Sequence, residues 1–413
     1  MATPTILLIG TADTKADELL FLKTSVERAG AIARIMDVGV LGEPPFAPDY
    51  SKHDVAAAAA TSNRAIIALG DENSAMVKQA EGAAKLAASL CERGQIDGML
   101  AIGGSMATDL ALDVASALPT GVPKMIASTV AFSPLLPPDR IPADVMMILW
   151  SAGLYGLNTI CQSILSQAAG AVVGACRSTT TLRAGKPIVG ISSLGTSSLK
   201  YIVRLKLELE KRGYEVAVFH TTGMGGRALE SLAKEGKLAA VMDFSLIEVS
   251  NYCNGSVVNS GAERLLGAGQ AGIPRIVAPG GVTLIDFQSW AEPPVDVGAR
   301  EIHVHNRLIS CVKLSVDEKV AVAAEIAAKL NQANGPSAFI MPLGGIDEWD
   351  KQGAPFHDPE GLSGFAHTLS ENLSDRTELH EIDAHINDAE FAATALRIFD
   401  RWVNDDVVVK GTL

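Results

Sequence analysis

Short apolar runs alternate with longer stretches of helical spacing along the first half of the chain. The apolar runs predict strands over residues 5–10, 31–38, 97–103, 123–129 and 145–149. Apolar residues recurring every three or four positions predict helices over residues 15–28, 72–93 and 106–117. Strands that are apolar throughout and separated by helices are typical of parallel sheets covered on both faces, so the first half predicts an α/β domain.

The same alternation restarts in the second half. Strands are predicted over residues 188–192, 216–220, 238–243, 275–278, 337–341 and 378–383, with helices over 197–212 and 388–402. Residues 178–187 (STTTLRAGKP) are polar and contain Gly and Pro, which favours a linker. We therefore predict two tandem Rossmann-like domains, residues 1–180 and 187–413, each a mostly parallel sheet flanked by helices.

Three features bear on where the protein resides. Residues 154–177 predict a long helix of small residues that is apolar on nearly every side, and we expect it to be buried. The longest apolar stretch, residues 145–157, is shorter than the ~20 residues of a membrane-spanning helix, and the amino terminus lacks the basic region of a signal peptide. Five cysteines scattered singly fit a reducing compartment. We expect a cytoplasmic protein without a membrane partner.

Composition and charge narrow the function classes. Apolar residues make up 48% of the chain and charged residues 20%, which excludes general disorder. The net charge is −13, and the lack of a basic excess argues against nucleic acid as a partner. Residues 344–413 hold 5 basic against 15 acidic residues, whereas residues 1–186 hold 14 against 17. The near-neutral first half is therefore compatible with an anionic small molecule.

The joints between strands and helices carry the candidate chemistry of the first half, because helix N-termini present free N–H groups there. The first joint runs from Gly10 to Lys15 (GTADTK). Its glycine permits close approach, the hydroxyls of Thr11 and Thr14 can bond phosphate, and Lys15 can place a positive charge on it. Asp13 could hold Mg²⁺ through water or cap the helix. An ordinary capped helix is the alternative, and no Walker A pattern occurs.

The neighbouring strand ends carry similar groups. Gly103, Gly104 and Ser105 form a second joint, at which phosphate could contact the amides of Gly104 and Ser105, or Ser105 could simply cap the helix. Asp37 ends the second strand, where an acidic residue reaches a ribose hydroxyl in dinucleotide folds, although a surface turn is the simpler interpretation. Thr129 follows a further strand. Together the four strand ends predict a ligand site without naming the ligand.

The second half has its own candidates. His220 ends a strand and is followed by three glycines and Arg227, whose charge opposes the helix dipole unless an anion balances it. A flexible loop with a surface arginine is the alternative. Asp243 and Glu248 could act as acid or base if buried. The loop at residues 195–198 (GTSS) predicts another helix start that could receive an anion.

Two histidines and several absent motifs complete the candidates. His303 and His305 share one face of any strand they form, but without an identifiable third ligand we predict a hydrogen-bonded pair rather than a metal site. The sequence lacks the GxSxG pattern of serine hydrolases, and its GxGxxG string (GAGQAG, 267–272) precedes a predicted strand instead of following one, which does not match the fingerprint of dinucleotide-binding folds. Hydride transfer is accordingly disfavoured.

Five segments occur in order along the chain: GTADTK (10–15), VPKMIASTVA (122–131), FHTTGMGGRALE (219–230), EIHVHN (301–306) and HINDAEFA (385–392). Together they resemble the Tm-one-like ATP-binding family, and the similarity extends over about residues 5–396. The resemblance implies two Rossmann-like domains, ATP with Mg²⁺ in the first domain, and a homodimer. By the same resemblance the ATP pocket includes Gly10, Thr11, Asp13, Thr14, Lys15, Asp37, Gly103, Gly104, Ser105 and Thr129.

One departure from the family pattern concerns the second joint. The pattern reads GGSGGT, whereas this chain has Met106 and Ala107 in place of the last two glycines. The change removes freedom for close approach and adds a bulky side chain. It leaves the identity of the ligand open, with another nucleotide or a sugar acid as alternatives to ATP.

Two functions from different classes follow from these residues. The first is a nucleotide-dependent enzyme acting on a small acidic metabolite in the second domain, where Arg227 holds the anion and His220 or His305 serves as acid or base. The second is an ATP-sensing dimer that binds a protein partner without catalysis. The second function is suggested by the resemblance and by the lack of a complete catalytic constellation in the sequence.

Overall fold

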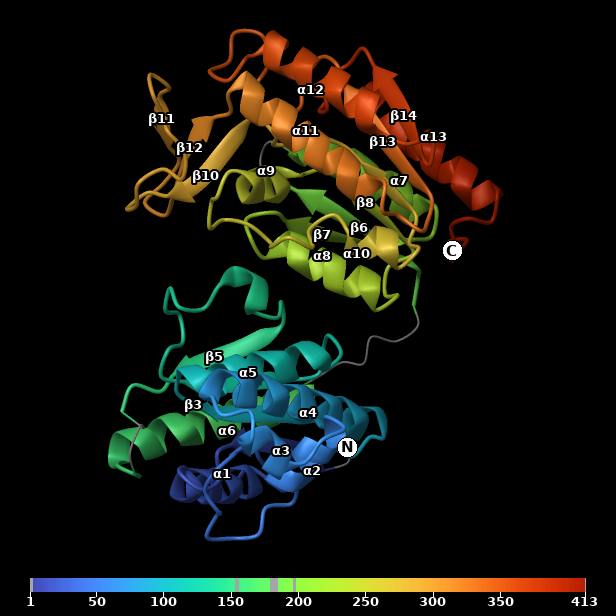
Figure 1. The fold of residues 1–413 in the computed structure, drawn as a ribbon. Helices are drawn as coiled ribbons and strands as arrows, with labels where there is room; N and C mark the ends of the chain where they lie inside the picture. The colour runs from blue at the N-terminus through green and yellow to red at the C-terminus, as the bar shows by residue number, and fades with distance from the viewer. Residues whose placement is uncertain (1–2, 153–155, 179–184, 196–197, 413) are drawn as a thin grey trace. The chain divides into compact units, whose positions relative to one another are not determined.

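The structure is a computed structural model that describes residues 3–152, 156–178, 185–195 and 198–412. It divides into two compact units, Met1–Thr181 and Leu182–Leu413 (Figure 1). Most of the predicted linker, and residues 196 and 197 of the predicted anion-binding loop, lie outside the described residues. Each unit is built around its own parallel sheet.

The first unit contains a five-stranded parallel sheet with the order β2-β1-β3-β4-β5. Its strands are β1 (Thr5–Gly10), β2 (Ile32–Asp37), β3 (Gly98–Gly103), β4 (Lys124–Ser128) and β5 (Val145–Leu149). All five lie within or at the predicted ranges. Because the strands are parallel, the loops that follow β1, β2 and β3 meet at one edge of the sheet.

Helices cover both faces of this sheet. One face carries α1 (Ala16–Arg28) and α6 (Thr159–Ser178). The other carries α2 (Lys52–Ala58), α4 (Glu72–Glu92) and α5 (Ser105–Ala117), with the short α3 (Asn63–Ile67) beside α2 and α4. Ile6 and Leu8 of β1 face one layer while Leu7 and Ile9 face the other, so the strand is buried on both sides.

The helix predicted over residues 154–177 forms, but the expectation that it is buried is wrong for most of its surface. α6 begins at Thr159 and buries one face, with Leu165 and Val172 against the sheet, whereas Ile160 is 58% exposed. α6 lies beside α1 on one face of the sheet. Among the described residues of this unit, no further layer packs on its outer side. By length and composition alone, α6 is the one helix of the described residues that could cross a membrane, a criterion that core helices also meet.

The second unit contains a six-stranded parallel sheet with the order β14-β13-β9-β8-β6-β7. Its strands are β6 (Ile188–Ser193), β7 (Glu215–His220), β8 (Ala240–Asp243), β9 (Arg275–Val277), β13 (Ser337–Pro342) and β14 (Thr377–Ile382). One face packs against α7 (Leu199–Lys211) and α13 (Ala389–Asn404). The other packs against α8 (Gly225–Lys234), α10 (Gly267–Gln270), α11 (Val316–Leu330) and α12 (Pro359–Asn372). The predicted fold class is confirmed for both units.

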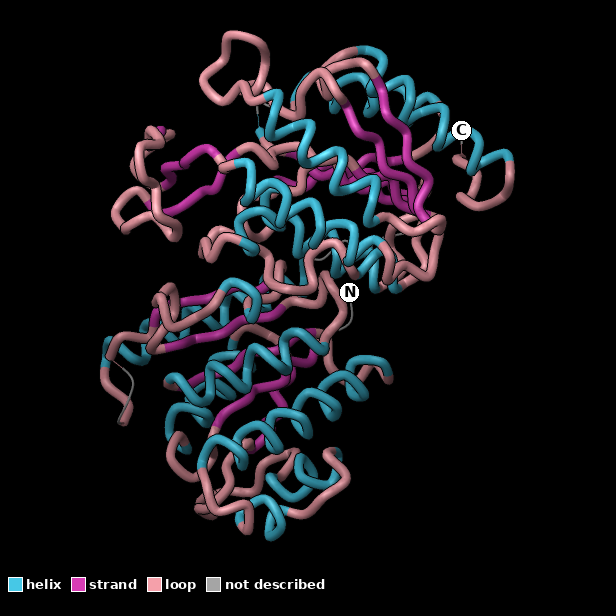
Figure 2. Tube along the Cα trace, turned by 45° about the horizontal axis from the view of Figure 1, so that its top comes forward, coloured by secondary structure: helices cyan, strands magenta, loops and turns pink. Residues whose placement is uncertain are grey.

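A small antiparallel sheet in the second unit was not predicted. It has the order β10-β12-β11, with β10 (Leu284–Gln288), β11 (Ile302–Val304) and β12 (Ile309–Lys313), and extends from the unit as an arm (Figures 1 and 2). Every residue of β11 is exposed. A strand of three exposed residues has no periodic burial pattern, which is why the sequence gives no clear signal for it.

Candidate functional site

A cavity of about 570 Å³ lies in the first unit at the carboxyl ends of β1, β2 and β3. The loops after these strands line it, together with parts of α4 and α5. Five of the predicted pocket residues are among the lining: Thr11, Asp13, Thr14, Gly104 and Ser105. The structure thus brings two of the four predicted strand ends together in one hollow.

The joint between β3 and α5 forms one side of the cavity. α5 begins at Ser105, and its N-cap residue, Gly104, offers no side chain to the first helical N–H groups. A Cβ on Gly103 would lie 2.2 Å from the Cβ of Ala107, so glycine is required where the strand turns tightly into the helix. The open helix start places partial positive charge at the cavity. Met106, the departure from the family pattern, also lines it.

The joint between β1 and α1 is held by its own side chains. The hydroxyls of Thr11 and Thr14 lie 2.6 Å apart. The carboxylate of Asp13 accepts hydrogen bonds from the amides of Thr14 at 2.9 Å and Gly42 at 3.1 Å, which ties this joint to the loop after β2. Asp13 does not cap α1, because the N-cap position belongs to Lys15 and has no side-chain cap.

The other five predicted pocket residues lie outside the cavity lining. Lys15 is buried, with its Nζ 5.9 Å from the ring centroid of Trp150. The Oδ1 of Asp37 accepts hydrogen bonds from the amides of Ala12 and Gly39, both at 2.9 Å, so this carboxylate holds two loops together. Burial raises the pKa of Asp37. The remaining residues, Gly10, Gly103 and Thr129, contribute backbone at the strand ends, with Thr129 N donating to Gly103 O at 3.1 Å.

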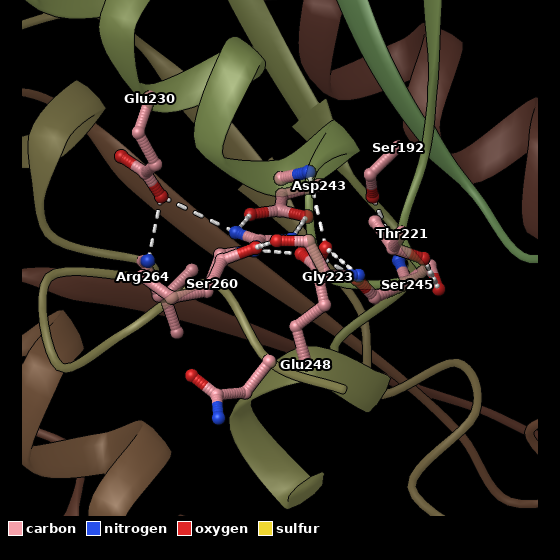
Figure 3. Close-up of polar contacts among 12 residues, drawn as sticks. Ser192, Thr221, Gly223, Glu230, Asp243, Ser245, Glu248, Ser260 and Arg264 are labelled. Atoms are coloured by element: carbon pink, nitrogen blue, oxygen red, sulfur yellow. Dashed lines mark hydrogen bonds and ion pairs between the residues drawn. The ribbon is translucent and has the colours of Figure 1, made fainter. Parts of the chain in front are cut away.

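The corresponding edge of the second unit contains a buried charge cluster (Figure 3). The guanidinium of Arg264 donates to Asp243 at 2.5 and 2.7 Å, to Glu248 at 2.8 Å and to Glu230 at 3.2 Å. Asp243 ends β8, Glu230 lies on α8, and Glu248 lies on α9 (Ile247–Cys253). All four side chains are buried, and burial raises the pKa of Glu230. One cation therefore serves three carboxyl groups.

Glu248 also occupies the helix start that the sequence analysis assigned to a bound anion. Its Oε1 accepts from the amides of Gly223 at 2.9 Å and Gly226 at 3.3 Å, at the beginning of α8. A Cβ on Gly226 would lie 1.8 Å from the other carboxylate oxygen. The glycines of this loop therefore make room for a carboxylate of the chain itself. Asp243 and Glu248 are buried, as their proposed roles require, but both are engaged by Arg264.

The three predicted catalytic residues lie on separate elements. His220 is exposed at the end of the edge strand β7, where its Nδ1 is 3.3 Å from Ser193 O. Arg227 is in the first turn of α8. His305 directly follows β11, the strand of the arm that lies away from β7 and α8 in Figure 1. Its ring and that of His303 contact Trp349, with centroids 6.3 and 4.6 Å away, so the two histidines flank an aromatic ring.

A second hollow, of about 470 Å³, lies where β13 ends and α12 begins. Asp350 lines it and is 3.3 Å from the Nε2 of the buried His385, which also lies 2.7 Å from Asp347 O. Burial opposes protonation of His385, yet Asp350 and the Asp347 carbonyl raise its pKa. Burial raises the pKa of Asp347 to about 6. The sequence analysis did not identify this acid–histidine group, whose members lie far apart along the chain.

No group of three or more His, Cys, Asp or Glu side chains in the described part of the chain is arranged to hold a metal ion. The sequence analysis did not identify Arg264 either, because no sequence pattern indicates that a single arginine in a loop is buried. Its three acidic partners come from three different elements. Only the fold brings them to one guanidinium.

The fold and its cavity define a two-unit α/β protein with a ligand-sized hollow at the carboxyl edge of the first sheet. The chain belongs to the uncharacterised protein family UPF0261, because the N-terminal domain of that family matches residues 4–181 and the C-terminal domain matches residues 186–403. A UPF0261 protein of Brucella melitensis is 54% identical over 411 residues, which cover 100% of this chain and 98% of the relative.

The predicted relationship to the Tm-one-like family is confirmed. The ToMV resistance protein Tm-1(GCR237) of Solanum lycopersicum is 30% identical over an alignment of 413 residues, covering 94% of this chain and 54% of the tomato protein. Among solved structures, the UDP-GlcNAc 2-epimerase of Neisseria meningitidis is similar with a TM-score of 0.23 and 10% identity, covering 66% of this chain and 82% of the epimerase. A similarity at that level supports no inference about function.

Proposed function

We propose that the protein binds ATP together with Mg²⁺ in the cavity of the first unit. The observation that carries this proposal is the open start of α5 at the carboxyl edge of the sheet, inside a hollow of about 570 Å³. Free N–H groups and the helix dipole favour phosphate at such a position. The hydroxyls of Thr11 and Thr14 line the same hollow. The resemblance of the GTADTK segment to the Tm-one-like family supports ATP as the nucleotide.

The charges of the cavity fit a metal-bound nucleotide better than a free one. Among the described residues that line it, none is Lys or Arg, whereas Asp13, Asp71 and Glu72 contribute carboxyl groups. A triphosphate without a cation would face these carboxylates unscreened. Mg²⁺ retains waters and is bound through one or two carboxylates together with phosphates, and Asp13 at the first joint is suited to that role.

We further propose that the second unit binds a small acidic metabolite near Arg227, with His220 as acid or base, in a nucleotide-dependent enzyme. A specific observation favours the competing function, an ATP-sensing homodimer that binds a protein partner. Glu248 already occupies the start of α8, and His305 lies on the arm rather than beside His220. Phosphate release measured with and without candidate acids distinguishes the two, since the sensor binds ATP without turnover.

Introducing a charge at the start of α5 tests the nucleotide site. Ser105→Asp is expected to weaken ATP binding at least about tenfold, because its carboxylate occupies the place of a phosphate. The same charge favours the helix start, so thermal stability should not fall. Ser315→Asp is the matched control, since Ser315 caps α11 in the second unit and aspartate also caps helices. Calorimetric titration of the full chain with Mg²⁺-ATP measures both variants, and equal affinity in Ser105→Asp and wild type would overturn the assignment.

A further inference from the structure

Gln79 lies on α4, which lines the cavity together with the start of α5. Its side chain is fully buried and lines the cavity. The Nε2 donates to Gly39 O at 3.2 Å, which fixes the amide so that its Oε1 is the remaining acceptor. That oxygen has no hydrogen-bond partner among the described residues. A buried acceptor without a donor is destabilising, so its retention in a cavity wall points to a donor that arrives with a ligand.

The position of Gln79 in the cavity indicates which end of a nucleotide it would meet. Gly39 follows β2 and Gly104 follows β3, and these strands flank β1 on either side. Two strand spacings, about 10 Å, therefore separate the end of β2, where Gln79 contacts Gly39, from the end of β3, where α5 begins. An extended nucleotide with its phosphates on α5 therefore directs its base toward Gln79.

The walls on this side of the cavity are apolar. Val40, Leu41, Ile67 and Met76 line it, and they offer hydrophobic side chains on which a flat ring can lie. Gln79 supplies the polar group fixed among them. Such a site accommodates a flat ring that presents an amino group to Gln79 and has few other hydrogen-bond donors.

We propose that the Oε1 of Gln79 accepts a hydrogen bond from the exocyclic amino group of adenine and so selects a 6-aminopurine over a 6-oxopurine. This inference rests on the proposed nucleotide site of the first unit. Adenine satisfies the acceptor with its amino group, whereas hypoxanthine presents a carbonyl oxygen to it, and two acceptors repel. Guanine has the same carbonyl and N1–H as hypoxanthine and adds a 2-amino group, a donor that the apolar walls leave unpaired.

The test compares ATP with ITP, two nucleotides that differ in the group at position 6 of the base. Calorimetric titration of the full-length protein with Mg²⁺-ATP and Mg²⁺-ITP is expected to give a Kd for ITP about tenfold higher or more. In Gln79→Met, a near-isosteric change, ATP affinity should fall up to about tenfold while ITP affinity stays constant or rises because the repulsion is removed, so the Kd ratio approaches one.

Asn63 provides a matched control. It is buried, its Nδ2 donates to Val40 O at 3.0 Å, and its Oδ1 also has no partner among the described residues, but it does not line the cavity. Asn63→Leu should disturb the loop after β2 as much as Gln79→Met does, yet keep the wild-type ratio of ITP to ATP affinity. An equal loss of the ratio in both variants would assign the effect to the loop and overturn the role of Gln79.

The outcomes separate this inference from the function on which it rests. If ATP and ITP bind wild type equally well, the role of Gln79 is wrong while the nucleotide site stands, and this comparison requires no variant to fold. If GTP binds more tightly than ATP, the assignment to adenine is wrong. If no nucleotide binds at all, the proposed function and this inference are both overturned.

Discussion

The carboxyl edges of the two sheets have similar sequence patterns, but one helix start is open and the other is occupied. In each unit a strand runs into glycines and then into a helix, at Gly103–Gly104 before α5 and at Gly223 before α8, whose first two residues are Gly225 and Gly226. The start of α5 has no side-chain cap and opens on a cavity. The start of α8 is occupied by the carboxylate of Glu248.

The difference shows that a glycine-rich joint marks a place for an anion without saying whose anion it is. In the first unit the joint is open, which leaves the position to a ligand. In the second unit a residue some twenty positions further along the chain fills it, and Arg264 holds that residue in place at 2.8 Å. A distant partner therefore decides whether the same local pattern is a binding site or part of the core.

The strongest challenge to this comparison is the removal of Arg264. Arg264→Met leaves Glu230, Asp243 and Glu248 buried without their cation, and breaking such a buried cluster is expected to lower the free energy of unfolding by about 3–5 kcal/mol. Chemical denaturation followed by tryptophan fluorescence reports on the second unit through the buried Trp402. Arg397→Met is the control, because Arg397 lies in the same unit, pairs with the exposed carboxylate of Glu390 and should change stability by less than about 1 kcal/mol. Equal effects of the two changes would contradict a stabilising cluster.

Emptying the filled site should make the second edge resemble the first. Glu248→Ala removes the acceptor from two amides and from the Nε of Arg264, which is expected to cost about 3 kcal/mol. The vacated space is suited to a small carboxylate, so acetate should raise the melting temperature of the variant more than chloride at equal ionic strength. Wild type, whose site is occupied, should respond equally to both salts. A variant that shows no preference for acetate would mean that the loop collapses when Glu248 is lost.

A buried acid without a cation provides a contrast within the second unit. Asp286 lies 3.5 Å from the Nδ2 of Asn251, and burial raises its pKa to about 6. The folded protein keeps this proton where the unfolded chain, with an ordinary value of 3.8, has lost it. The free energy of unfolding should therefore fall as the pH rises from about 4 to about 6, by roughly 2–3 kcal/mol from this group, and then level off.

Asp286→Asn isolates that contribution. The variant should match wild type near pH 4 and exceed its stability above pH 6, because an amide carries no charge to be buried. Asp383 is exposed in the same unit, so Asp383→Asn should leave the difference in free energy of unfolding between pH 4.5 and pH 7.5 unchanged. Urea denaturation at pH 4.5 and 7.5 measures both variants, and an unaltered pH dependence in Asp286→Asn would rule out a buried, protonated Asp286.

The contrast between the two edges also explains what the sequence could predict. β1 and β5 were predicted at their observed bounds, since each is a short run of apolar residues; β1 is buried on both sides, whereas β5 at the edge of the sheet is only partly buried. The loops of the first cavity were located because local joints build it. Gln79, by contrast, lies inside a helix forty residues from the backbone carbonyl it contacts, and no local pattern distinguishes it from a solvated glutamine. The cluster at Arg264 depends on tertiary contacts in the same way.

The smallest expected effect concerns the fit of the two glycine joints. Gly103→Ala places a Cβ 2.2 Å from that of Ala107 and should cost about 1–3 kcal/mol through overpacking. Ala107→Gly removes the opposing methyl group, so the double variant should recover much of that loss. A double-mutant cycle measures this coupling. The two positions are coupled if the double variant loses less free energy of unfolding than the sum of the losses in the two single variants. In the second unit, Gly226→Ala meets the Glu248 carboxylate, and Glu248→Ala should relieve it in turn. If Ala107→Gly did not recover stability lost in Gly103→Ala, the loss would come from the backbone conformation of Gly103 rather than from the contact with Ala107.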